Sequence, residues 1–566
     1  MPRDTIAYMR NVFLIGLSGS GKSTIARLLA QRLQRPLFDL DLLIEQKAGM
    51  SIPAIFAQHG ERYFRECERV VLAEAVQQQA GAVIATGGGI VSEAANRALM
   101  SEHGVRVFLH VEPEVALQRL LAQHRTAIER GEQPETRPLL EGSDPLARLQ
   151  NLLALRHQWY AEAEHTCHVQ GKSVEQITSE IIAMLVSSGA LEGAEPLVRH
   201  IQAGSGYDAI VEWGGLGRLP QYLKQVQSSS RVFLFTDSHL APLYADTLLQ
   251  NLTGAGFEPH LYVVPAGEES KSMAQLGAIY DWLVEQRAER RETLIAFGGG
   301  VIGDLIGFVA ASYLRGVPLV QVPTSLLAQV DSAIGGKTGI NHPRGKNLIG
   351  AFYHPRLVLA DPAVLLTLPV RSRTEGWAEI VKYGMIVDAE LFSLLEAHQD
   401  SLREFSPPPV ALLSQIIARS IDLKASVIES DEREQGLRAI LNYGHTIGHA
   451  LESVAGYGEW LHGEAVSLGM VAAAAIAYEA GMFSAEEMAR QNALLSALGL
   501  PTEYRGDVRA EDILAKIQLD KKVVGKRVRW IMPRRIGEVE ITEMPDELVT
   551  RVVTAFFGQK KGSQGE

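Results

Sequence analysis

The chain has 566 residues, and its 54 Lys and Arg against 66 Asp and Glu give a formal net charge of −12. Hydrophobic residues make up 46% of the chain and charged residues 21%, values typical of proteins with sizeable cores, so a wholly disordered or collagen-like chain is excluded. The acidic balance argues against a protein that coats nucleic acid, because such proteins need a basic surface.

The cysteine content and the apolar windows indicate a cellular location. Two cysteines, Cys67 and Cys167, are too few for a disulfide framework, so we expect a reducing cytoplasm. No signal-peptide pattern appears at the start of the sequence. The most apolar window, residues 466–477, is shorter than the roughly 20 residues of a bilayer span, so it predicts a buried helix and no membrane association.

The first third of the chain alternates strand and helix patterns. Apolar runs predict strands at 12–15, 82–85 and 105–111, and periodic patterns predict helices at 23–33 and 174–186. This alternation is typical of a parallel sheet with helical crossovers. We therefore expect an α/β domain at residues 1–186 and a polar connector at 187–205.

A second α/β region follows the connector. Strands are expected at 209–211, 232–235 and 294–297, and we place the α/β part at residues 206–365. Strand signals then fade, and residues 366–566 are expected to be mainly helical. Its predicted elements are helices at 410–427 and 465–480, a short strand pair at 528–532 and 539–541, and a last helix.

A phosphate-binding loop follows the first strand. Residues 16–23, Gly-Leu-Ser-Gly-Ser-Gly-Lys-Ser, satisfy G-x-x-x-x-G-K-[ST] between a strand and a helix. The glycines let backbone N–H groups face the phosphates at a helix N-terminus. Lys22 reaches the β- and γ-phosphates and Ser23 ligates Mg²⁺, so the loop predicts a nucleotide site.

Further polar motifs follow in the same domain. Asp39 and Asp41 lie on a segment that we expect to be extended, where both side chains point to one side. One carboxylate there suits a metal ion and the other an acceptor hydroxyl, although such a pair on its own is usually a solvated loop or a helix cap. The remaining motifs are Phe64-Arg65-Glu66, Thr86-Gly87-Gly88-Gly89, Thr136-Arg137-Pro138-Leu139-Leu140 and Arg156.

With these motifs in this order, residues 10–186 resemble shikimate kinase. The resemblance implies ATP binding by Gly19, Ser20, Gly21, Lys22, Ser23, Thr24 and Arg137, shikimate binding by Asp41, Arg65, Gly88 and Arg156, and Mg²⁺ binding by Ser23 and Asp39. It implies catalytic roles for Lys22, Asp41 and Arg137, with Arg137 on a mobile lid that neutralises the transferred phosphoryl group. The sequence departs from the family in a long polar lid, 122–135, and in His157-Gln158-Trp159-Tyr160, where Pro-Leu-Tyr is usual. The alternative is a nucleotide-sensing module, which shikimate would not stimulate.

The second half carries a candidate metal site. Glu379 and Lys382 share a predicted helix, 376–383, while His445 and His449 lie four residues apart on another. One carboxylate with two imidazoles, the second from His462, suits catalytic Zn²⁺, although a His-x-x-x-His pair alone has little weight. The neighbouring segments contain six cations that would be costly without an anionic ligand, namely Arg315, Lys337, Lys346, Lys382, Lys424 and Arg438.

A glycine-rich loop and a series of long motifs complete this second site. The loop, 298–304, follows an apolar strand, where a backbone can approach a pyrophosphate. The further motifs are 265–271, 322–331, 335–341, 345–347, 378–379, 441–445, 448–449 and 520–522. Together they resemble 3-dehydroquinate synthase over residues 201 to about 558.

This second resemblance implies three sets of ligands. The NAD⁺ set is Asp237, Glu268, Lys271, Gly299, Gly300, Val301, Ile302, Gly303, Asp304, Thr324, Ser325, Lys337, Lys346 and Thr367. The metal set, for Zn²⁺ or Co²⁺, is Glu379, His445 and His462. The substrate set is Arg315, Asp331, Lys337, Lys346, Asn347, Lys382, Lys424, Arg438, Asn442, His449 and one of Lys521 and Lys522.

Among these, the implied catalytic residues are Lys337, Lys382, Lys424 and His449, the last as a proton shuttle. The departures from the family are modest. His239 stands where Asn is common, Ser325 where Thr is frequent, and 371–373 where an acidic run is commoner.

The two resemblances together imply a bifunctional enzyme of chorismate biosynthesis. The first half would phosphorylate shikimate at its 3-hydroxyl with ATP. The second would convert 3-deoxy-D-arabino-heptulosonate 7-phosphate to 3-dehydroquinate and phosphate, as a homodimer. Another sugar-phosphate cyclase or a polyol dehydrogenase remains the alternative for the second half.

Overall fold

The computed structural model describes residues 10–33, 35–78, 81–129, 144–191, 195–227, 229–405, 408–432, 436–456, 458–524 and 528–558, with backbone only at 519–524. The chain folds into two compact units that meet in sequence between residues 194 and 195. Each unit is described by itself.

The first unit is a parallel sheet flanked by helices. Its strands are β1 (Asn11–Ile15), β2 (Leu37–Asp39), β3 (Val83–Ala85), β4 (Gly104–His110) and β5 (His165–His168), in the order β2-β3-β1-β4-β5. Its helices are α1 (Lys22–Leu33), α2 (Leu40–Ala48), α3 (Ile52–Gln78), η2 (Ile90–Ser92), α4 (Ala94–His103), α5 (Pro113–Glu129), α6 (Pro145–Tyr160) and α7 (Val174–Ser187). Every residue of β1 is buried, which matches its apolar run, and all its pairings are parallel. The expected strands and helices of this domain are confirmed.

One local expectation in this unit is wrong. Asp41 lies in the first turn of α2 and not on an extended segment, because β2 ends at Asp39, which is the residue before the helix. The expected lid begins as helix, since residues 122–129 continue α5. The rest of that lid, with Arg137, lies outside the described residues.

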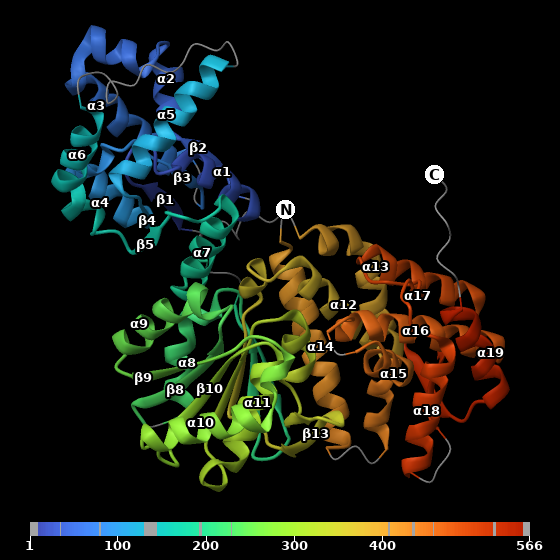
Figure 1. Cartoon of the computed structure of the whole chain (residues 1–566). Helices are drawn as coiled ribbons and strands as arrows, with labels where there is room; N and C mark the ends of the chain where they lie inside the picture. The colour runs from blue at the N-terminus through green and yellow to red at the C-terminus, as the bar shows by residue number, and fades with distance from the viewer. Residues whose placement is uncertain are drawn as a thin grey trace. The chain divides into compact units, whose positions relative to one another are not determined.

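The second unit contains a seven-stranded sheet (Figure 1). Its strands are β6 (Leu197–Ile201), β7 (Tyr207–Val211), β8 (Arg231–Asp237), β9 (Glu258–Val264), β10 (Thr293–Gly298), β11 (Leu319–Pro323) and β14 (Leu357–Ala360), in the order β6-β7-β14-β11-β10-β8-β9. All neighbours are parallel except β6 and β7. Part of the expected connector is therefore a strand. β6 is an exposed edge strand, so it lacks the apolar alternation that would have predicted it.

Helices cover this sheet, and a hairpin extends from it. The helical elements are η4 (Gly215–Arg218), α8 (Leu219–Val226), η5 (Ala241–Ala245), α9 (Asp246–Gly254), η6 (Glu268–Ser270), α10 (Met273–Glu285), α11 (Gly300–Ser312), η7 (Tyr313–Arg315), η8 (Ala328–Ser332) and η9 (Pro362–Leu366). β12 (Lys337–His342) and β13 (Gly345–Phe352) form an antiparallel hairpin that packs on α11. The core between the sheet and α10 and α11 contains Phe233, Phe235, Leu294 and Ile302, all at most 1% exposed.

The rest of the second unit is mainly helical, as expected (Figure 1, yellow-brown to red). Its elements are α12 (Val370–Ile386), α13 (Ala389–Glu404), α14 (Val410–Ser430), η10 (Leu437–Asn442), α15 (His445–Ala455), α16 (His462–Glu479), α17 (Ala485–Ala497), α18 (Ala510–Val524), β15 (Trp530–Arg535), β16 (Glu538–Thr542) and α19 (Asp546–Phe557). The apolar window at 466–477 lies in α16, whose buried face is nearly continuous. Across the described residues, the helices are too short or too polar to cross a membrane.

Candidate active sites

The phosphate loop of the first unit is shaped by glycines. Gly16, Gly19 and Gly21 have φ values of +148°, +84° and +92°, which favour glycine. A Cβ at Gly19 would lie 2.7 Å from the carbonyl oxygen of Ala116. Lys22 Nζ donates to the carbonyl oxygens of Gly16 and Leu17, both at 2.9 Å, so the lysine lies across the loop. Ser23 and Thr24 are exposed at the start of α1.

The loop of residues 86–89 brings the other motifs of this unit together. Gly87 lies against two carboxylates, because a Cβ there would be 2.8 Å from Glu68 Oε1 and 3.0 Å from Asp41 Oδ1. Gly88 lies against the phosphate loop, and Gly89 against the guanidinium of Arg65. The sequence-predicted Asp41, Arg65 and Gly88 thus surround one loop.

Arg156 reaches the same loop from α6. Its Nη1 donates to the carbonyl oxygen of Gly88 at 2.9 Å, and the hydroxyl of Tyr160 donates to the same oxygen at 2.7 Å. Tyr160 is fully buried and stacks on Phe108, with ring centroids 4.7 Å apart. Burial raises its pKa to about 12, so it remains a donor. Although His157-Gln158-Trp159 differs from the usual sequence of the resembled family, the residue that follows is still a tyrosine that contacts the 86–89 loop.

Arg65 is held by a buried acid that the sequence motifs missed. Its Nη1 donates to Glu68 at 2.8 Å and its Nη2 to Glu61 at 3.1 Å, and its guanidinium carbon lies 5.3 Å from the centre of the Phe64 ring. Burial raises the pKa of Glu68, which Arg65 opposes. Glu68 lies three residues after Arg65 on α3, and this helical spacing is the signal that would have identified it.

In the second unit, three neighbouring parallel strands end at the sheet edge from which the glycine-rich loop begins. β8 ends at Asp237, β10 at Gly298 and β11 at Pro323, and parallel strands with this arrangement place ligands at their carboxyl edge. Gly299 precedes α11 with no side-chain cap from the described residues, and a Cβ there would lie 3.6 Å from Ser325 Oγ. The N–H of Thr324 donates to Gly298 at 3.0 Å. The 299–303 loop, Thr324 and Ser325 therefore lie together.

Other residues of the expected cofactor set lie around this edge. Asp237 Oδ1 accepts backbone N–H bonds from His239 and Leu240 at 2.8 and 3.0 Å. The hydroxyls of Thr367 and Tyr244 are 2.7 Å apart.

Lys271 links the glycine-rich region to the β12–β13 hairpin. Its Nζ donates to Asp304 Oδ2 at 2.7 Å and to Asn347 Oδ1 at 2.6 Å. Glu268 Oε1 accepts from Asn341 Nδ2 at 2.7 Å. Burial raises the pKa of Asp304, against the opposing charge of Lys271.

A partly buried ion pair joins the α/β and helical parts of this unit. Lys424 Nζ, on α14, donates to Asp331 Oδ1 at 2.8 Å and to its carbonyl oxygen at 2.6 Å. The hydroxyl of Tyr383, on α12, donates to the same carboxylate at 3.0 Å. Burial lowers the pKa of Lys424. Burial by itself would raise the pKa of Asp331, but Lys424 keeps it below its ordinary value.

The expected metal ligands converge from three helices. Glu379, on α12, is fully buried, and its Oε1 lies 3.5 Å from Nε2 of His445 and 3.6 Å from Nε2 of His462. That oxygen has no hydrogen-bond partner within the described structure, while Oε2 accepts from Lys382. The ligand atoms of His445, His462 and His449 also lie within 4.8 Å of one another.

The charges at this cluster are strongly coupled. Burial by itself would raise the pKa of Glu379, but Lys382 and the two imidazoles hold it well below its usual range. Burial would lower the pKa of His462, yet Glu379 and Glu452 raise it to about 10. Burial and His462 lower the pKa of His449 to about 4. The cluster therefore attracts a positive charge to the position between Glu379 and His462 and keeps His449 neutral.

The remaining expected substrate residues are placed as follows. Arg438 is 1% exposed, donates to the carbonyl oxygen of Glu432 at 2.6 Å, and has a buried Nε that lacks a described partner. Arg315 lies in the left-handed region at φ +62°, a strained conformation of the kind found at functional sites. Lys337 begins β12, Asn442 ends η10, and the side chains of Lys521 and Lys522 lie outside the described residues.

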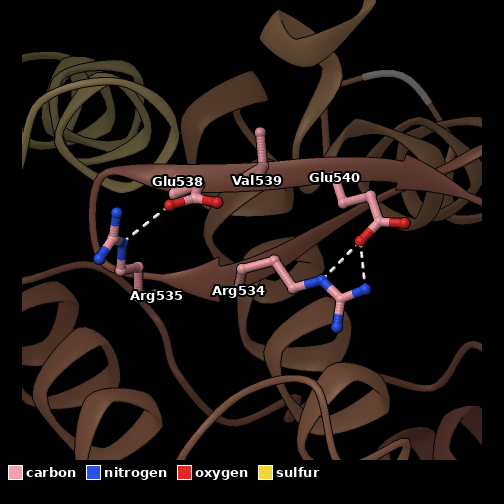
Figure 2. A pocket seen from close by; sticks show the side chains of 5 residues that line it. All are labelled: Arg534, Arg535, Glu538, Val539 and Glu540. Carbon is pink, nitrogen blue, oxygen red and sulfur yellow. Dashed lines mark hydrogen bonds and ion pairs between the residues drawn. The ribbon is translucent and has the colours of Figure 1, made fainter.

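An open hollow lies on the β15–β16 hairpin. Figure 2 shows its lining, which is Arg534, Arg535, Glu538, Val539 and Glu540. Both arginines are paired, Arg534 with Glu540 and Arg535 with Glu538 at 2.8 Å. Of the sequence-predicted residues that the structure describes, none lines this hollow, so it is not the candidate site.

The folds and sites define two classes of protein in one chain: a P-loop kinase unit, and an α/β enzyme with a glycine-rich edge beside a histidine–carboxylate cluster. Family models agree. Residues 18–186 match the model of shikimate kinase, residues 261–375 that of the 3-dehydroquinate synthase N-terminal part, and residues 376–523 that of its C-terminal part.

Relatives and solved structures support the second half. The 3-dehydroquinate synthase of Nostoc punctiforme is 49% identical over 350 residues, covering 61% of this chain and 96% of that protein. That of Desulforamulus reducens is 47% identical over 326 residues, covering 58% and 90%. The solved structure of ValA, a 2-epi-5-epi-valiolone synthase from Streptomyces hygroscopicus subsp. jinggangensis with NAD⁺ and Zn²⁺ bound, is 29% identical with a TM-score of 0.58, covering 64% of this chain and 99% of that one. A 2-deoxy-scyllo-inosose synthase complexed with carbaglucose-6-phosphate, NAD⁺ and Co²⁺ is 25% identical with a TM-score of 0.58, covering 64% and 100%.

The chain belongs to the 3-dehydroquinate synthase family and carries a shikimate kinase domain ahead of the synthase. The mixed α/β fold class and both resemblances are thereby confirmed.

Proposed function

We propose that the first unit transfers the γ-phosphoryl group of ATP to the 3-hydroxyl of shikimate. The observation that carries this proposal is the 86–89 loop, which contacts the phosphate loop on one side and Asp41 and Arg65 on the other. A substrate held by Arg65, Gly88 and Arg156 would therefore lie beside the nucleotide phosphates.

The residues of this unit have separate roles in binding the nucleotide, the metal ion and the substrate. Backbone N–H groups of Gly19 to Thr24 bind the phosphates, and Lys22 turns from the loop carbonyls to the phosphoryl oxygens. Ser23 and Asp39 hold the Mg²⁺ that accompanies ATP. Asp41 accepts the proton of the attacking hydroxyl, while the two arginines bind the substrate carboxylate. Arg137, outside the described residues, is proposed to neutralise charge on the transferred group.

ATP turnover by the purified chain tests this activity. We expect ADP release to rise at least tenfold on adding shikimate, and Asp41→Asn to remove the increase while the synthase activity persists. ATP turnover that ignores shikimate would overturn the proposal and favour a nucleotide-sensing module.

We propose that the second unit is an NAD⁺- and metal-dependent 3-dehydroquinate synthase. The observation that supports a metal site is the position of the buried Glu379 Oε1. It lies near two imidazole nitrogens and has no hydrogen-bond partner among the described residues. A carboxylate and two histidines are a suitable donor set for Zn²⁺ or Co²⁺. His449 completes an alternative three-histidine set, but Glu379 supplies the negative charge that a divalent cation needs in a buried position.

The cofactor would lie along the carboxyl edge of the sheet. Asp237, Glu268, Lys271, the 299–304 loop, Thr324, Ser325 and Thr367 would hold NAD⁺, with Lys337 and Lys346 close by. A bound NAD⁺ would supply reversible hydride transfer, and a metal ion held by Glu379, His445 and His462 would supply Lewis acidity.

The protein's own residues bind and orient the substrate. Lys337, Lys346, Arg315 and Arg438 supply positive charge for the phosphate, and the unpartnered Nε of Arg438 is one donor available for it. Lys382, Lys424, Asp331, Asn347 and Asn442 complete the pocket, with one of Lys521 and Lys522. His449 moves a proton at the reacting carbon, a role that its neutral state allows.

Product analysis separates this activity from its rivals. With 3-deoxy-D-arabino-heptulosonate 7-phosphate we expect one phosphate for each 3-dehydroquinate formed and no accumulation of NADH, whereas a polyol dehydrogenase would accumulate it. The identities of 46 to 49% to 3-dehydroquinate synthases, against 29% and 25% to the two other cyclases, favour this substrate. Failure to form 3-dehydroquinate would overturn the proposal.

We also propose that the enzyme is a cytoplasmic homodimer. The synthase family suggests the dimer, and both cysteines, Cys67 and Cys167, are free thiols, as expected in a reducing compartment. Light scattering of the full chain tests the dimer, since a monomeric mass at assay concentration would contradict it.

A further inference from the structure

Glu452 is a buried carboxylate that neither the sequence motifs nor the proposed mechanism uses. It lies on α15 together with His445 and His449, seven and three residues before it, so all three share one helix face. Its side chain is 7% exposed. A buried carboxylate on that face requires partners.

The two oxygens of Glu452 face different partners. Oε2 lies 3.3 Å from Nδ1 of His462, and Oε1 accepts from Nζ of Lys346 at 3.1 Å. The other ring nitrogen of His462, Nε2, faces Glu379. A chain of contacts thus runs from Lys346 on the β12–β13 hairpin, through Glu452 and His462, to the carboxylate of the proposed metal site.

The two histidines of that site are oriented in different ways. Nδ1 of His445 lies 3.1 Å from the carbonyl oxygen of Tyr443, so the backbone fixes that ring. The ring of His462 is oriented by the side chain of Glu452, so a substitution can test this contact. A carboxylate at Nδ1 places the proton there and leaves the Nε2 lone pair directed at a cation.

We propose that Glu452 is a positioning residue of the metal centre, which fixes the ring and tautomer of His462 and links them to Lys346. The inference rests on the proposed metal site. It assigns no substrate contact to Glu452. Because Lys346 belongs to the hairpin and Glu452 to α15, the link also makes metal affinity depend on the position of the hairpin.

Cobalt binding by the full chain tests the proposal without relying on turnover. Co²⁺ is added to metal-free protein, its dissociation constant is measured by competition with a chelator, and its visible absorption bands are recorded. We expect Glu452→Ala to weaken Co²⁺ binding by about 10- to 100-fold and to shift the bands. We expect a loss of about tenfold for Glu452→Gln, whose amide oxygen still accepts from Nδ1, and of about fivefold for Lys346→Met.

The matched control is Glu464→Gln. Glu464 lies two residues after His462, and its carboxylate pairs with Arg371 at 2.7 Å and accepts from the N–H of Leu461. Glutamine at this position removes the same charge and keeps the helix cap, so Co²⁺ affinity and spectrum should be unchanged.

The outcomes separate this inference from the proposed metal site. If His445→Ala loses Co²⁺ but both Glu452 variants match the wild type in affinity and spectrum, the positioning role is wrong and the metal site stands. If His445→Ala binds Co²⁺ as the wild type does, the metal site itself is wrong. If the alanine variant fails to fold, judged by circular dichroism and by tryptophan fluorescence, Glu452→Gln decides by the same criteria.

Discussion

The two candidate sites of this chain differ in the groups that form them, which are mainly backbone groups in one and charged side chains in the other. In the kinase unit the nucleotide site is mostly backbone, namely glycines with positive φ, a helix N-terminus and a lysine lying across loop carbonyls. In the synthase unit the site is mostly buried side-chain charge, with pairs that include Lys424–Asp331, Lys382–Glu379 and Lys346–Glu452. A backbone site is damaged by adding atoms, because close approach is its function. A side-chain site is damaged by removing one partner, because the other is left as an uncompensated buried charge.

The largest expected difference concerns the metal. Removing tightly bound metal from the purified chain should lower synthase activity about 1,000-fold, since the metal contributes several kcal/mol to transition-state stabilisation. Kinase activity should return with Mg²⁺ alone, because its site needs only the ion that accompanies ATP. Both activities are measured on one sample after chelation, with metal content checked by elemental analysis. Synthase activity that survives complete metal loss would contradict the expectation that this activity depends on a tightly bound metal ion.

The kinase site should instead be sensitive to a single added carbon. In Gly19→Ala the new Cβ would meet the Ala116 carbonyl at 2.7 Å, and φ of +84° is strained for alanine. We expect about 100-fold lower kinase kcat/KM, the effect of a misplaced phosphate loop, and unchanged synthase activity.

Gly49→Ala is the matched control for that substitution. Gly49 also has positive φ, +67°, but no atom of the described residues lies within 4 Å of its Cβ position. It should therefore show the backbone strain as a small loss of stability and keep kinase activity. Equal kinase losses in both variants would show that strain, and not the close approach, is responsible.

One side chain of the kinase unit should behave like those of the synthase. Arg65 holds Glu68 and Glu61 with separate nitrogens, and its planar guanidinium lies near the Phe64 ring. Arg65→Lys keeps the charge but cannot form the same fork, so we expect KM for shikimate to rise roughly tenfold with little change in KM for ATP. Steady-state kinetics with Arg62→Lys, an exposed neighbour on the same helix, provide the comparison. A larger rise for ATP than for shikimate would place Arg65 in the wrong subsite.

The sequence was most informative where function depends on local order. The P-loop could be predicted in full, because strand, glycine loop and helix are consecutive, and the His445–His449 pair lies on a helix as its spacing indicates. Asp41 was predicted on an extended segment but lies in the first turn of α2, because no local sequence pattern indicates that β2 ends after three residues. The exposed edge strand β6 was missed because exposure removes the apolar alternation on which the prediction depends.

Contacts between distant residues could not be predicted from local patterns. Glu452 shares a helix face with His445 and His449, a visible signal, but its bond to Lys346 spans 106 positions in the chain. Tyr160 likewise contacts Gly88 across 72 positions. Periodicity says which face is buried, and only the tertiary fold says which carboxylate or carbonyl that face meets.

The smallest expected effect tests buried charge away from both sites. Asp361 is 1% exposed, and its two oxygens accept backbone N–H bonds from Gly214, Leu216 and Ala363 at 2.8 to 2.9 Å. Burial raises the pKa of Asp361 to about 7, although those three donors favour the charged form. A folded-state pKa above the unfolded value of about 3.9 means that the folded protein binds the proton more tightly, so this residue's contribution to stability falls as pH rises from 4 to 7.

Asp361→Asn should therefore lower the free energy of unfolding by about 1–3 kcal/mol near pH 5, because an N–H of the asparagine amide would face a backbone N–H. The difference in stability from wild type should narrow toward pH 8. Denaturant unfolding of the full chain, followed by tryptophan fluorescence, reports on this unit because five of the six tryptophans lie in it. A difference that widens as pH rises would mean that the three N–H donors outweigh desolvation and that Asp361 is charged throughout. The second unit would then stabilise a buried carboxylate with backbone dipoles, the means that the kinase unit uses for phosphate, and the contrast between the two units would be confined to their active sites.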